Sequence, residues 1–271
     1  MLQLYIMNLI QTLVLSIVEG ITEFLPISST GHLILASNLL KITQTEFVKS
    51  FEIIIQLGAI LAVVAIYFNK LIIKFDFDLW KKIIIAFIPS IIFGLIFYKL
   101  IKTYLIGNSI IVILSLFIGG AIMILFEKFY ERKKQKFNKF KSKEKVLTNK
   151  DYLVIGFFQV FSMIPGVSRA FTTIFGGMLL GMKRKDATEF SFFLAIPTMF
   201  AASALDLIKT DLSIWTNSNY LVLGIGFIGS FITAFITIKF LIKFVQNHNF
   251  INFGIYRIII SIIFAILALK V

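Results

Sequence analysis

Residues 19–32 read Glu19-Gly20-Ile21-Thr22-Glu23-Phe24-Leu25-Pro26-Ile27-Ser28-Ser29-Thr30-Gly31-His32, in the middle of an otherwise apolar stretch that covers residues 1–40. A second apolar stretch, residues 152–182, is interrupted in the same way by Ile164-Pro165-Gly166-Val167-Ser168-Arg169. Proline and glycine disfavour the interior of a helix. Each stretch is therefore expected to form two helices joined by a polar loop, not one continuous helix.

The composition of the whole chain is that of a membrane protein. Of its 271 residues, 58% are hydrophobic and only 15% are charged, and the mean hydropathy is +0.93. Soluble domains carry about 25% charged residues. The absence of cysteine excludes disulfides, cysteine-ligated zinc, iron–sulfur clusters and thiol nucleophiles. We expect a single integral membrane domain that covers residues 1–271.

Six apolar runs outside the two interrupted stretches are close to the roughly 20 residues that cross a bilayer. Non-helical backbone at membrane depth is tolerated only inside protein or beside a water-filled cavity, so the two interrupted stretches are interpreted as re-entrant helix-loop-helix hairpins. The predicted fold is an all-α polytopic membrane protein with six spanning helices and two re-entrant hairpins. The runs lie at 53–68, 83–98, 103–126, 190–205, 220–238 and 251–269.

The distribution of lysine and arginine supports this topology, because cytoplasmic loops carry most of the basic residues of a membrane protein. Segments 69–82, 127–150, 183–185 and 239–250 hold 19 Lys and Arg residues, whereas the opposite face has six. The net charge of +13 is therefore assigned to cytoplasmic loops and not to nucleic-acid binding. Both termini are predicted to be extracytoplasmic, with the first hairpin opening outward and the second inward.

The two halves of the chain have the same order of elements. A shift of 139 residues places Leu25-Pro26-x-x-Ser29 over Ile164-Pro165-x-x-Ser168. Each half has three spans, an odd number, so residues 1–126 and 151–271 would form an inverted-topology repeat. Residues 127–150 would be a basic cytoplasmic linker between them. Such a repeat brings the two hairpin tips together near the membrane midplane.

The first hairpin contains two carboxylates four residues apart, which places Glu19 and Glu23 on one helix face. Buried carboxylates need a partner. A divalent cation, a hydroxyl group or a cation from the second hairpin would each serve. The residues by themselves leave these three partners of Glu19 and Glu23 open.

Hydroxyls and basic groups at the two tips indicate an anion site. Ser28, Ser29 and Thr30 follow Pro26, where backbone N–H groups are free to hold an anion. His32 titrates near neutral pH and is a candidate acid or base. An arginine inside the membrane is a functional-site hypothesis by default, so Arg169 is expected to bind a phosphate or an acidic side chain. Gln56, Ser168 and Thr173 are further candidate ligands, whereas Arg257 is expected to snorkel to the membrane surface or pair with a neighbouring acid.

Residues 19–32 resemble the first signature of the bacterial undecaprenyl-diphosphate phosphatases of the bacitracin-resistance type, including its Glu-x-x-x-Glu element. Residues 165–173, Pro165-Gly166-Val167-Ser168-Arg169-Ala170-Phe171-Thr172-Thr173, are similar to the second signature, Pro-Gly-x-Ser-Arg-Ser-x-x-Thr. The resemblance continues through Phe51-Glu52-x-x-Ile55-Gln56-Leu57-Gly58 and Glu189-Phe190-Ser191-Phe192. The chain departs from the family pattern at Ala170 and Phe171, where the family usually has Ser and Gly.

The resemblance implies hydrolysis of the C55 lipid undecaprenyl diphosphate to undecaprenyl phosphate on the extracytoplasmic side of the bacterial plasma (inner) membrane. This reaction recycles the carrier for cell-wall polymer synthesis and confers bacitracin resistance. The expected partners are the polyprenyl diphosphate substrate and membrane lipids, without nucleic acid, and a homodimer is compatible with this interpretation. The expected catalytic residues are Ser29, His32, Glu23 and Arg169, and the expected substrate-binding residues are Ser28, Thr30, Ser168, Thr173 and Gln56. With a diphosphate substrate, Mg²⁺ or Ca²⁺ held by Glu19 and Glu23 is the expected cofactor, because hard cations prefer carboxylate and phosphate oxygens.

Three mechanisms stay open at this point. In the preferred one Ser29 attacks the terminal phosphorus, Glu23 or His32 accepts its proton, and Arg169 stabilises the phosphoryl oxygens. His32 or an activated water is the alternative nucleophile. An alternating-access flippase of polyprenyl phosphate is the rival function, because inverted repeats with broken helices are also a transporter architecture.

Overall fold

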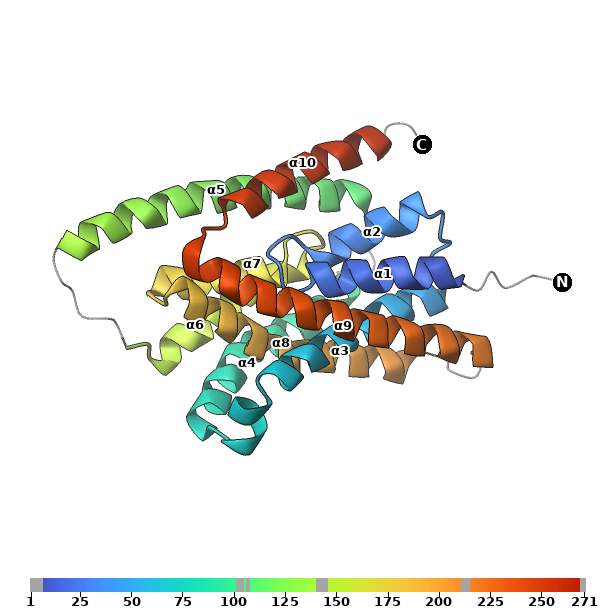
Figure 1. Ribbon diagram of the computed structural model, residues 1–271, viewed down its shortest axis with the longest axis horizontal. Coiled ribbons are helices and arrows are strands. Elements are labelled where there is room, and N and C mark those ends of the chain that lie inside the picture. The colour runs from blue at the N-terminus through green and yellow to red at the C-terminus, as the bar shows by residue number, and fades with distance from the viewer. Residues whose placement is uncertain (1–6, 101–104, 106–107, 140–145, 211–214, 269–271) are drawn as a thin grey trace.

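The computed structural model describes residues 7–100, 105, 108–139, 146–210 and 215–268, and within these ranges the protein is helical without strands (Figure 1). Short π and 3₁₀ segments lie at Asn69–Ile73 and Phe161–Met163. The α-helices are α1 (Leu9–Thr22), α2 (Ser29–Leu39), α3 (Glu46–Ile66), α4 (Phe77–Leu100), α5 (Ser109–Lys139), α6 (Asn149–Val160), α7 (Arg169–Leu180), α8 (Arg184–Lys209), α9 (Asn217–Asn247) and α10 (Ile251–Ala268).

Each of the six predicted spans falls on one of the helices α3, α4, α5, α8, α9 and α10. Five of them, α3, α4, α5, α8 and α9, are long and apolar enough to cross a membrane. The part of α10 that was assessed, Ile251–Leu267, is apolar but shorter. The predicted span ends that reach 103, 104 and 269 lie outside the described residues. These helices are those of a multi-pass membrane protein.

Part of the region 127–150 is helical. The predicted linker begins at Glu127, but α5 continues as a helix to Lys139, and residues 140–145 lie outside the described ranges. Glu127 is fully buried, and it accepts hydrogen bonds from Arg184 Nη2 at 2.7 Å and from the Phe250 N–H at 3.1 Å. This turn packs against the start of α8 and the corner between α9 and α10. The residues that follow include many Glu, Lys and Arg, which are good helix formers, so the helix continues.

Both interrupted stretches are broken into two helices, as the proline and glycine positions predict. A turn over residues 23–28 separates α1 from α2, and Phe161–Ser168 separates α6 from α7. Ser28 and Ser168 share an unusual backbone conformation, with φ of 73° and 78°. Each is the N-cap of the following helix, and its side chain accepts a hydrogen bond from the N–H three residues later. The local structure therefore pairs Ser28 with Ser168, a shift of 140 residues and not 139.

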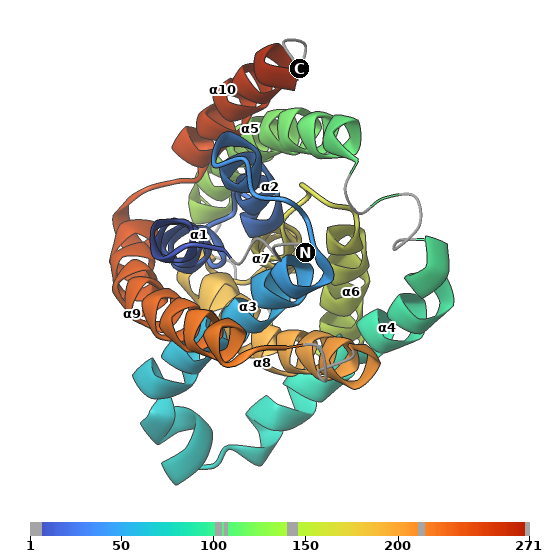
Figure 2. The same cartoon turned by 90° about the vertical axis from the view of Figure 1, so that its right-hand side faces the viewer.

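The helices pack around these two loops (Figures 1 and 2). Helices α1 and α3 both pack on α9, α3 also contacts α8, and α4 packs on α6. Helix α10 runs alongside α5 at one side of the molecule, as both views show. Close approach depends on glycine where helices cross, because a Cβ on Gly58 of α3 would overlap the carbonyl of Phe227 on α9. The two loops are thereby enclosed by helices from both halves.

Candidate active site

A cavity of about 160 Å³ lies where the two loops meet. Nine of its thirteen lining residues have polar or charged side chains, although the helices around it are apolar. The two loops and the adjoining turns of α3 and α8 provide the wall. Seven of the residues predicted from the sequence to bind or act on substrate line the cavity. The lining residues are Glu23, Ser28, Ser29, Thr30, Gln56, Ser162, Pro165, Gly166, Ser168, Arg169, Thr198, Met199 and Ala202.

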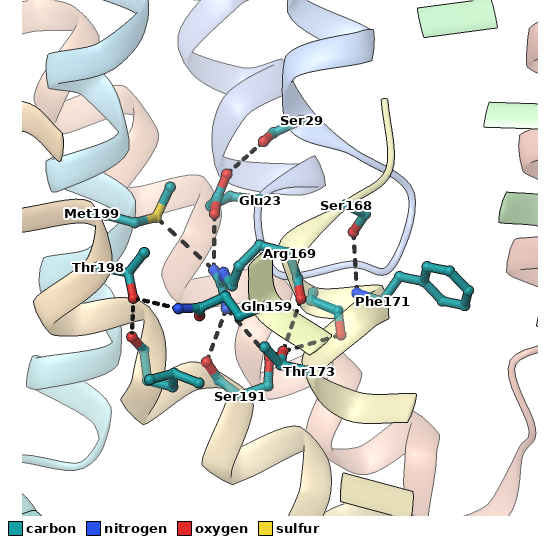
Figure 3. Close-up of polar contacts among 12 residues, drawn as sticks. Glu23, Ser29, Gln159, Ser168, Arg169, Phe171, Thr173, Ser191, Thr198 and Met199 are labelled. Carbon is teal, nitrogen blue, oxygen red and sulfur yellow. Dashed lines mark hydrogen bonds and ion pairs between the residues drawn. The ribbon is translucent and has the colours of Figure 1, made fainter. Parts of the chain in front are cut away.

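Three of these residues form a continuous chain of hydrogen bonds across the two halves (Figure 3). Ser29 Oγ donates to Glu23 Oε2 at 2.5 Å. Arg169 Nη2 donates to Glu23 Oε1 at 2.9 Å, an ion pair in which both side chains are nearly buried. Glu23 stands at the end of α1, Ser29 begins α2 and Arg169 begins α7. A hydroxyl, a base and a group that orients the base therefore meet at one wall of the cavity.

The guanidinium of Arg169 is held by residues behind the cavity. Its Nη1 donates to the carbonyl oxygen of Ser191 at 2.9 Å and to Ser191 Oγ at 3.3 Å. Thr173 Oγ1 donates to Ser191 Oγ at 2.7 Å, so Thr173 supports the arginine from α7 and does not line the cavity. Arg169 Nε is buried without a hydrogen-bond partner. The guanidinium therefore keeps one N–H donor that no described residue accepts.

The N-termini of two helices face the same cavity. Ser28 and Ser29 lie at the start of α2, and Ser168 and Arg169 lie at the start of α7. The first N–H groups of a helix lack intrahelical acceptors and carry a partial positive charge. The side chain of Thr30 is exposed at this position. Two helix N-termini and a guanidinium make the cavity suited to a multiply charged anion.

Glu19 lies one turn before Glu23 on α1 and is completely buried. Both of its carboxylate oxygens lack a hydrogen-bond partner, and the residue does not line the cavity. An unpaired buried carboxylate costs several kcal/mol unless it holds a proton or a cation. Among the described residues no group of three Asp, Glu, His or Cys side chains is arranged to hold a metal. A cation at Glu19 and Glu23 would therefore need further oxygen ligands beyond these two side chains, from water, the backbone or a substrate.

His32 lies behind the first loop and not in the cavity wall. Its Nδ1 is 2.7 Å from the carbonyl oxygen of Ser28, and its Nε2 is 2.8 Å from the hydroxyl of Tyr256 on α10. The His32 and Tyr256 rings are nearly parallel, with centroids 5.5 Å apart. Both ring nitrogens of the predicted acid or base are thus engaged by groups other than Ser29 and Glu23.

Some residues that line or support the cavity were not predicted from the sequence. Thr198 and Met199 line the cavity from α8, where the sequence reads as an apolar span. Ser191 was part of a family motif, but nothing in its type indicated that it would hold Arg169. Arg257 is fully buried and donates only to backbone carbonyls, so the predictions of surface snorkelling and of an acidic partner are both wrong.

The two departures from the family signature lie outside the cavity wall. Ala170 and Phe171 are buried within the first turn of α7. The Phe171 ring packs against Phe175, with centroids 4.6 Å apart, and the Arg257 guanidinium carbon lies 5.1 Å from the Phe171 centroid. A serine side chain at position 170 would therefore be enclosed by the core.

Comparison with known proteins agrees with this geometry. An undecaprenyl-diphosphatase of Aquifex aeolicus is 53% identical over 255 residues, which cover 94% of this chain and 96% of the relative. Proteins of the same name from Sulfurihydrogenibium sp. and Persephonella marina are 50% and 47% identical, over 95% and 97% of this chain and 98% and 100% of the relatives. The family model described as bacitracin resistance protein BacA matches residues 12–263. A match over nearly the whole chain, with both loops included, shows that this protein belongs to the bacitracin resistance protein BacA family.

Proposed function

We propose that the protein hydrolyses undecaprenyl diphosphate to undecaprenyl phosphate and inorganic phosphate, which recycles the carrier lipid and confers bacitracin resistance. The relatives named undecaprenyl-diphosphatase and the family match support this activity. The observation that carries the assignment to a site is the hydrogen-bonded chain from Ser29 through Glu23 to Arg169 in a cavity lined by two helix N-termini.

In the first step Ser29 Oγ attacks the terminal phosphorus. Glu23 Oε2, which already accepts the hydroxyl hydrogen at 2.5 Å, takes the proton as the Oγ–P bond forms. The bond between the terminal phosphorus and the bridging oxygen breaks, and undecaprenyl phosphate leaves with the electron pair of that bond. In the second step water attacks the phosphoserine, Oγ regains a proton, and inorganic phosphate is released.

Charge on the transferring group is stabilised by fixed donors. Arg169 lines the cavity together with the first residues of α2 and α7, and the N-terminal ends of these helices carry a partial positive charge. Phosphoryl transfer depends mainly on positioning and electrostatic stabilisation, so preorganised donors of this kind lower the barrier. Ser28, Thr30, Ser168 and Gln56 line the cavity and bind the remaining diphosphate oxygens in this proposal. Thr173 acts through Ser191.

A divalent cation, Mg²⁺ or Ca²⁺, is part of the proposal. Glu19 offers two carboxylate oxygens without hydrogen-bond partners, one helical turn from Glu23. A bound cation would neutralise diphosphate charge, with its remaining positions filled by substrate oxygens. We expect CaCl₂ alone to raise the melting temperature of the wild-type protein and not that of a Glu19→Gln variant. Equal shifts in the two proteins would remove Glu19 from the cation site.

The proposal also includes a membrane topology for the protein and its active site. The proposal includes six spans, two re-entrant hairpins and an inverted repeat of residues 1–126 and 151–271. The matched φ values and caps of Ser28 and Ser168 support the correspondence of the two hairpins. The cavity then opens to the extracytoplasmic side, with both termini on that side. A homodimer is the proposed assembly, and the mass of the protein–detergent complex tests it.

The experiment that tests the function is phosphate release from C55 polyprenyl diphosphate by purified protein in detergent, with and without EDTA. We expect release by the wild type, loss with EDTA, and loss in Ser29→Ala. Ser261→Ala is a matched control, because Ser261 is a buried serine of α10 that bonds only its own helix. Wild-type protein that is folded and releases no phosphate would contradict the proposal.

The same variant separates hydrolysis from transport. A polyprenyl-phosphate flippase needs groups that bind an anion but needs no hydroxyl aligned with a base. The 2.5 Å bond between Ser29 and Glu23 therefore favours hydrolysis. Retained lipid flipping by Ser29→Ala, with phosphate release absent in the wild type, would instead support the transporter.

A further inference from the structure

Among the residues that the structure describes, Arg257 is the largest fully buried side chain. It stands on α10, and its guanidinium reaches between α5 and the two active-site loops. All five of its N–H groups lie within hydrogen-bond distance of backbone carbonyl oxygens. The acceptors are Leu116 (from Nε, 3.4 Å), Pro26 and Val167 (from Nη1, 3.2 and 3.0 Å), and Ser115 and Gly166 (from Nη2, 3.0 and 2.9 Å).

These acceptors come from both halves of the active site. Pro26 lies in the loop that ends at Ser28 and Ser29, whereas Gly166 and Val167 lie in the loop that ends at Ser168 and Arg169. A single Nη1 group bridges one carbonyl of each loop. The two loops are therefore fastened to one planar group, and neither can shift against the other without losing a charge-assisted hydrogen bond.

The fastening also sets the direction of the second loop. The Val167 carbonyl turns toward Arg257, and because the peptide bond to Ser168 is trans, the Ser168 N–H points away from the guanidinium. No salt bridge of Arg257 is present among the described residues, so carbonyl dipoles surround its charge. The guanidinium therefore orients backbone carbonyl groups and does not neutralise a carboxylate.

Glycines make room for this arrangement. Gly119 of α5 lies directly against the guanidinium, and a Cβ at this position would overlap Arg257 Nη2. Gly166 has a φ of +91°, and a Cβ there would lie 2.8 Å from the carbonyl oxygen of Val112. Two separate helices, α5 and α10, are thus shaped to deliver one guanidinium to the backs of the loops.

We propose that Arg257 is a positioning residue for the hydrolytic reaction, which holds the loop of Ser29 and the loop of Arg169 in a fixed mutual register. Ser29 supplies the attacking oxygen and Arg169 binds the group that is attacked, so their separation decides the attack geometry. A displacement of about 1 Å at a reacting centre lowers a rate on the order of 10²-fold. This inference rests on the proposed function of the two loops.

The test compares Arg257→Gln and Arg257→Lys with the wild type, with kcat and KM measured per folded, monodisperse protein. We expect kcat of Arg257→Gln to fall on the order of 10²-fold while KM changes by less than about threefold, because the binding groups remain. Lysine supplies three donors for five carbonyls, so we expect Arg257→Lys to recover part of kcat. Arg184→Gln is the control, since it removes a partly buried arginine that is paired with the buried Glu127 and is expected to lower stability but not kcat.

A second variant keeps the arginine and moves it. Gly119→Ala is expected to lower kcat by roughly tenfold or more because its methyl group displaces the guanidinium. Gly224→Ala, with no atom within 4 Å of the added carbon, is the control and is expected to match the wild type. A wild-type kcat in folded Arg257→Gln overturns the inference, and if that variant does not fold, a wild-type kcat in Gly119→Ala overturns it. Activity retained by Ser29→Ala would refute Ser29 as the nucleophile. The kcat values of the Arg257 variants would still test the positioning role of Arg257, so the two proposals can fail separately.

Discussion

At the scale of single residues, the proposed mechanism depends on the position of Glu23. One carboxylate oxygen accepts from Ser29 and the other from Arg169, so Glu23 is oriented as a base while its charge is balanced. His32 was the other candidate for the proton, but its ring nitrogens contact the Ser28 carbonyl and the Tyr256 hydroxyl. The geometry therefore favours Glu23 for proton transfer and gives His32 a part in holding the first loop.

Replacement of Glu23 by glutamine is expected to lower kcat about 10²- to 10⁴-fold, the usual contribution of a general base. The amide keeps the shape of the side chain but cannot accept the proton. Steady-state phosphate release at saturating substrate measures the effect. Glu189→Gln provides the control, because Glu189 contacts Lys70 and Lys185 outside the cavity. A kcat within a factor of about three of wild type would exclude Glu23 as the base.

The second prediction at this scale concerns His32. We expect His32→Ala to reduce kcat less than Glu23→Gln does. Among the described residues, the ring nitrogens of His32 are hydrogen-bonded to the Ser28 carbonyl and the Tyr256 hydroxyl, and not to Ser29 or Glu23. The two variants are compared under identical detergent and metal conditions. A larger loss in His32→Ala than in Glu23→Gln would return His32 to the role of base or nucleophile.

At the scale of elements, helix crossings place the broken helices. Helix α1 carries Glu23 and packs on α9, and α3 packs on the same helix. The crossing of α3 and α9 leaves no room for a side chain at Gly58, whose Cβ would overlap the Phe227 carbonyl. The position of Gln56 in the cavity wall depends on this crossing, because it lies on the same helix two residues earlier.

Gly58→Ala is expected to destabilise the protein by about 1–3 kcal/mol, the usual cost of overpacking. The backbone carbonyl of Phe227 cannot move aside as a side-chain tip can, so the two helices must separate. Thermal unfolding followed by circular dichroism in detergent measures the change, with Gly224→Ala of the neighbouring helix α9 as the control. Equal melting temperatures for the two variants would show that the crossing tolerates a methyl group.

At the scale of the whole molecule, the open question is which loops share a side of the membrane. The prediction places residues 69–82 and 239–250 in the cytoplasm and the segment between α2 and α3 outside. The structure contains five helices suited to spanning, but length and composition do not fix their orientation. The absence of cysteine makes the orientation accessible, because single cysteines can be introduced without background.

We expect Thr43→Cys to react with a membrane-impermeant maleimide in intact cells, and Lys74→Cys and Gln246→Cys to react only after lysis. All three positions are exposed. If the second hairpin crossed the membrane, every later loop would change sides. Labelling of Lys74→Cys and Gln246→Cys on opposite sides would therefore contradict re-entrance, and wild-type protein without cysteine controls for background.

The sequence by itself determined the class of protein, the helix breaks and most of the chemistry. Apolar runs, Pro26 and Pro165, and the carboxylates, hydroxyls and guanidinium of two motifs are local signals that each residue carries in its type. Only the tertiary structure decided which of these groups meet: Glu23 with Ser29 and Arg169, and His32 with Tyr256. The prediction for Arg257 was wrong because its partners are distant in sequence. For Arg257 those partners are backbone carbonyls, which every residue has, so no pattern of residue types reveals them before the chain is folded.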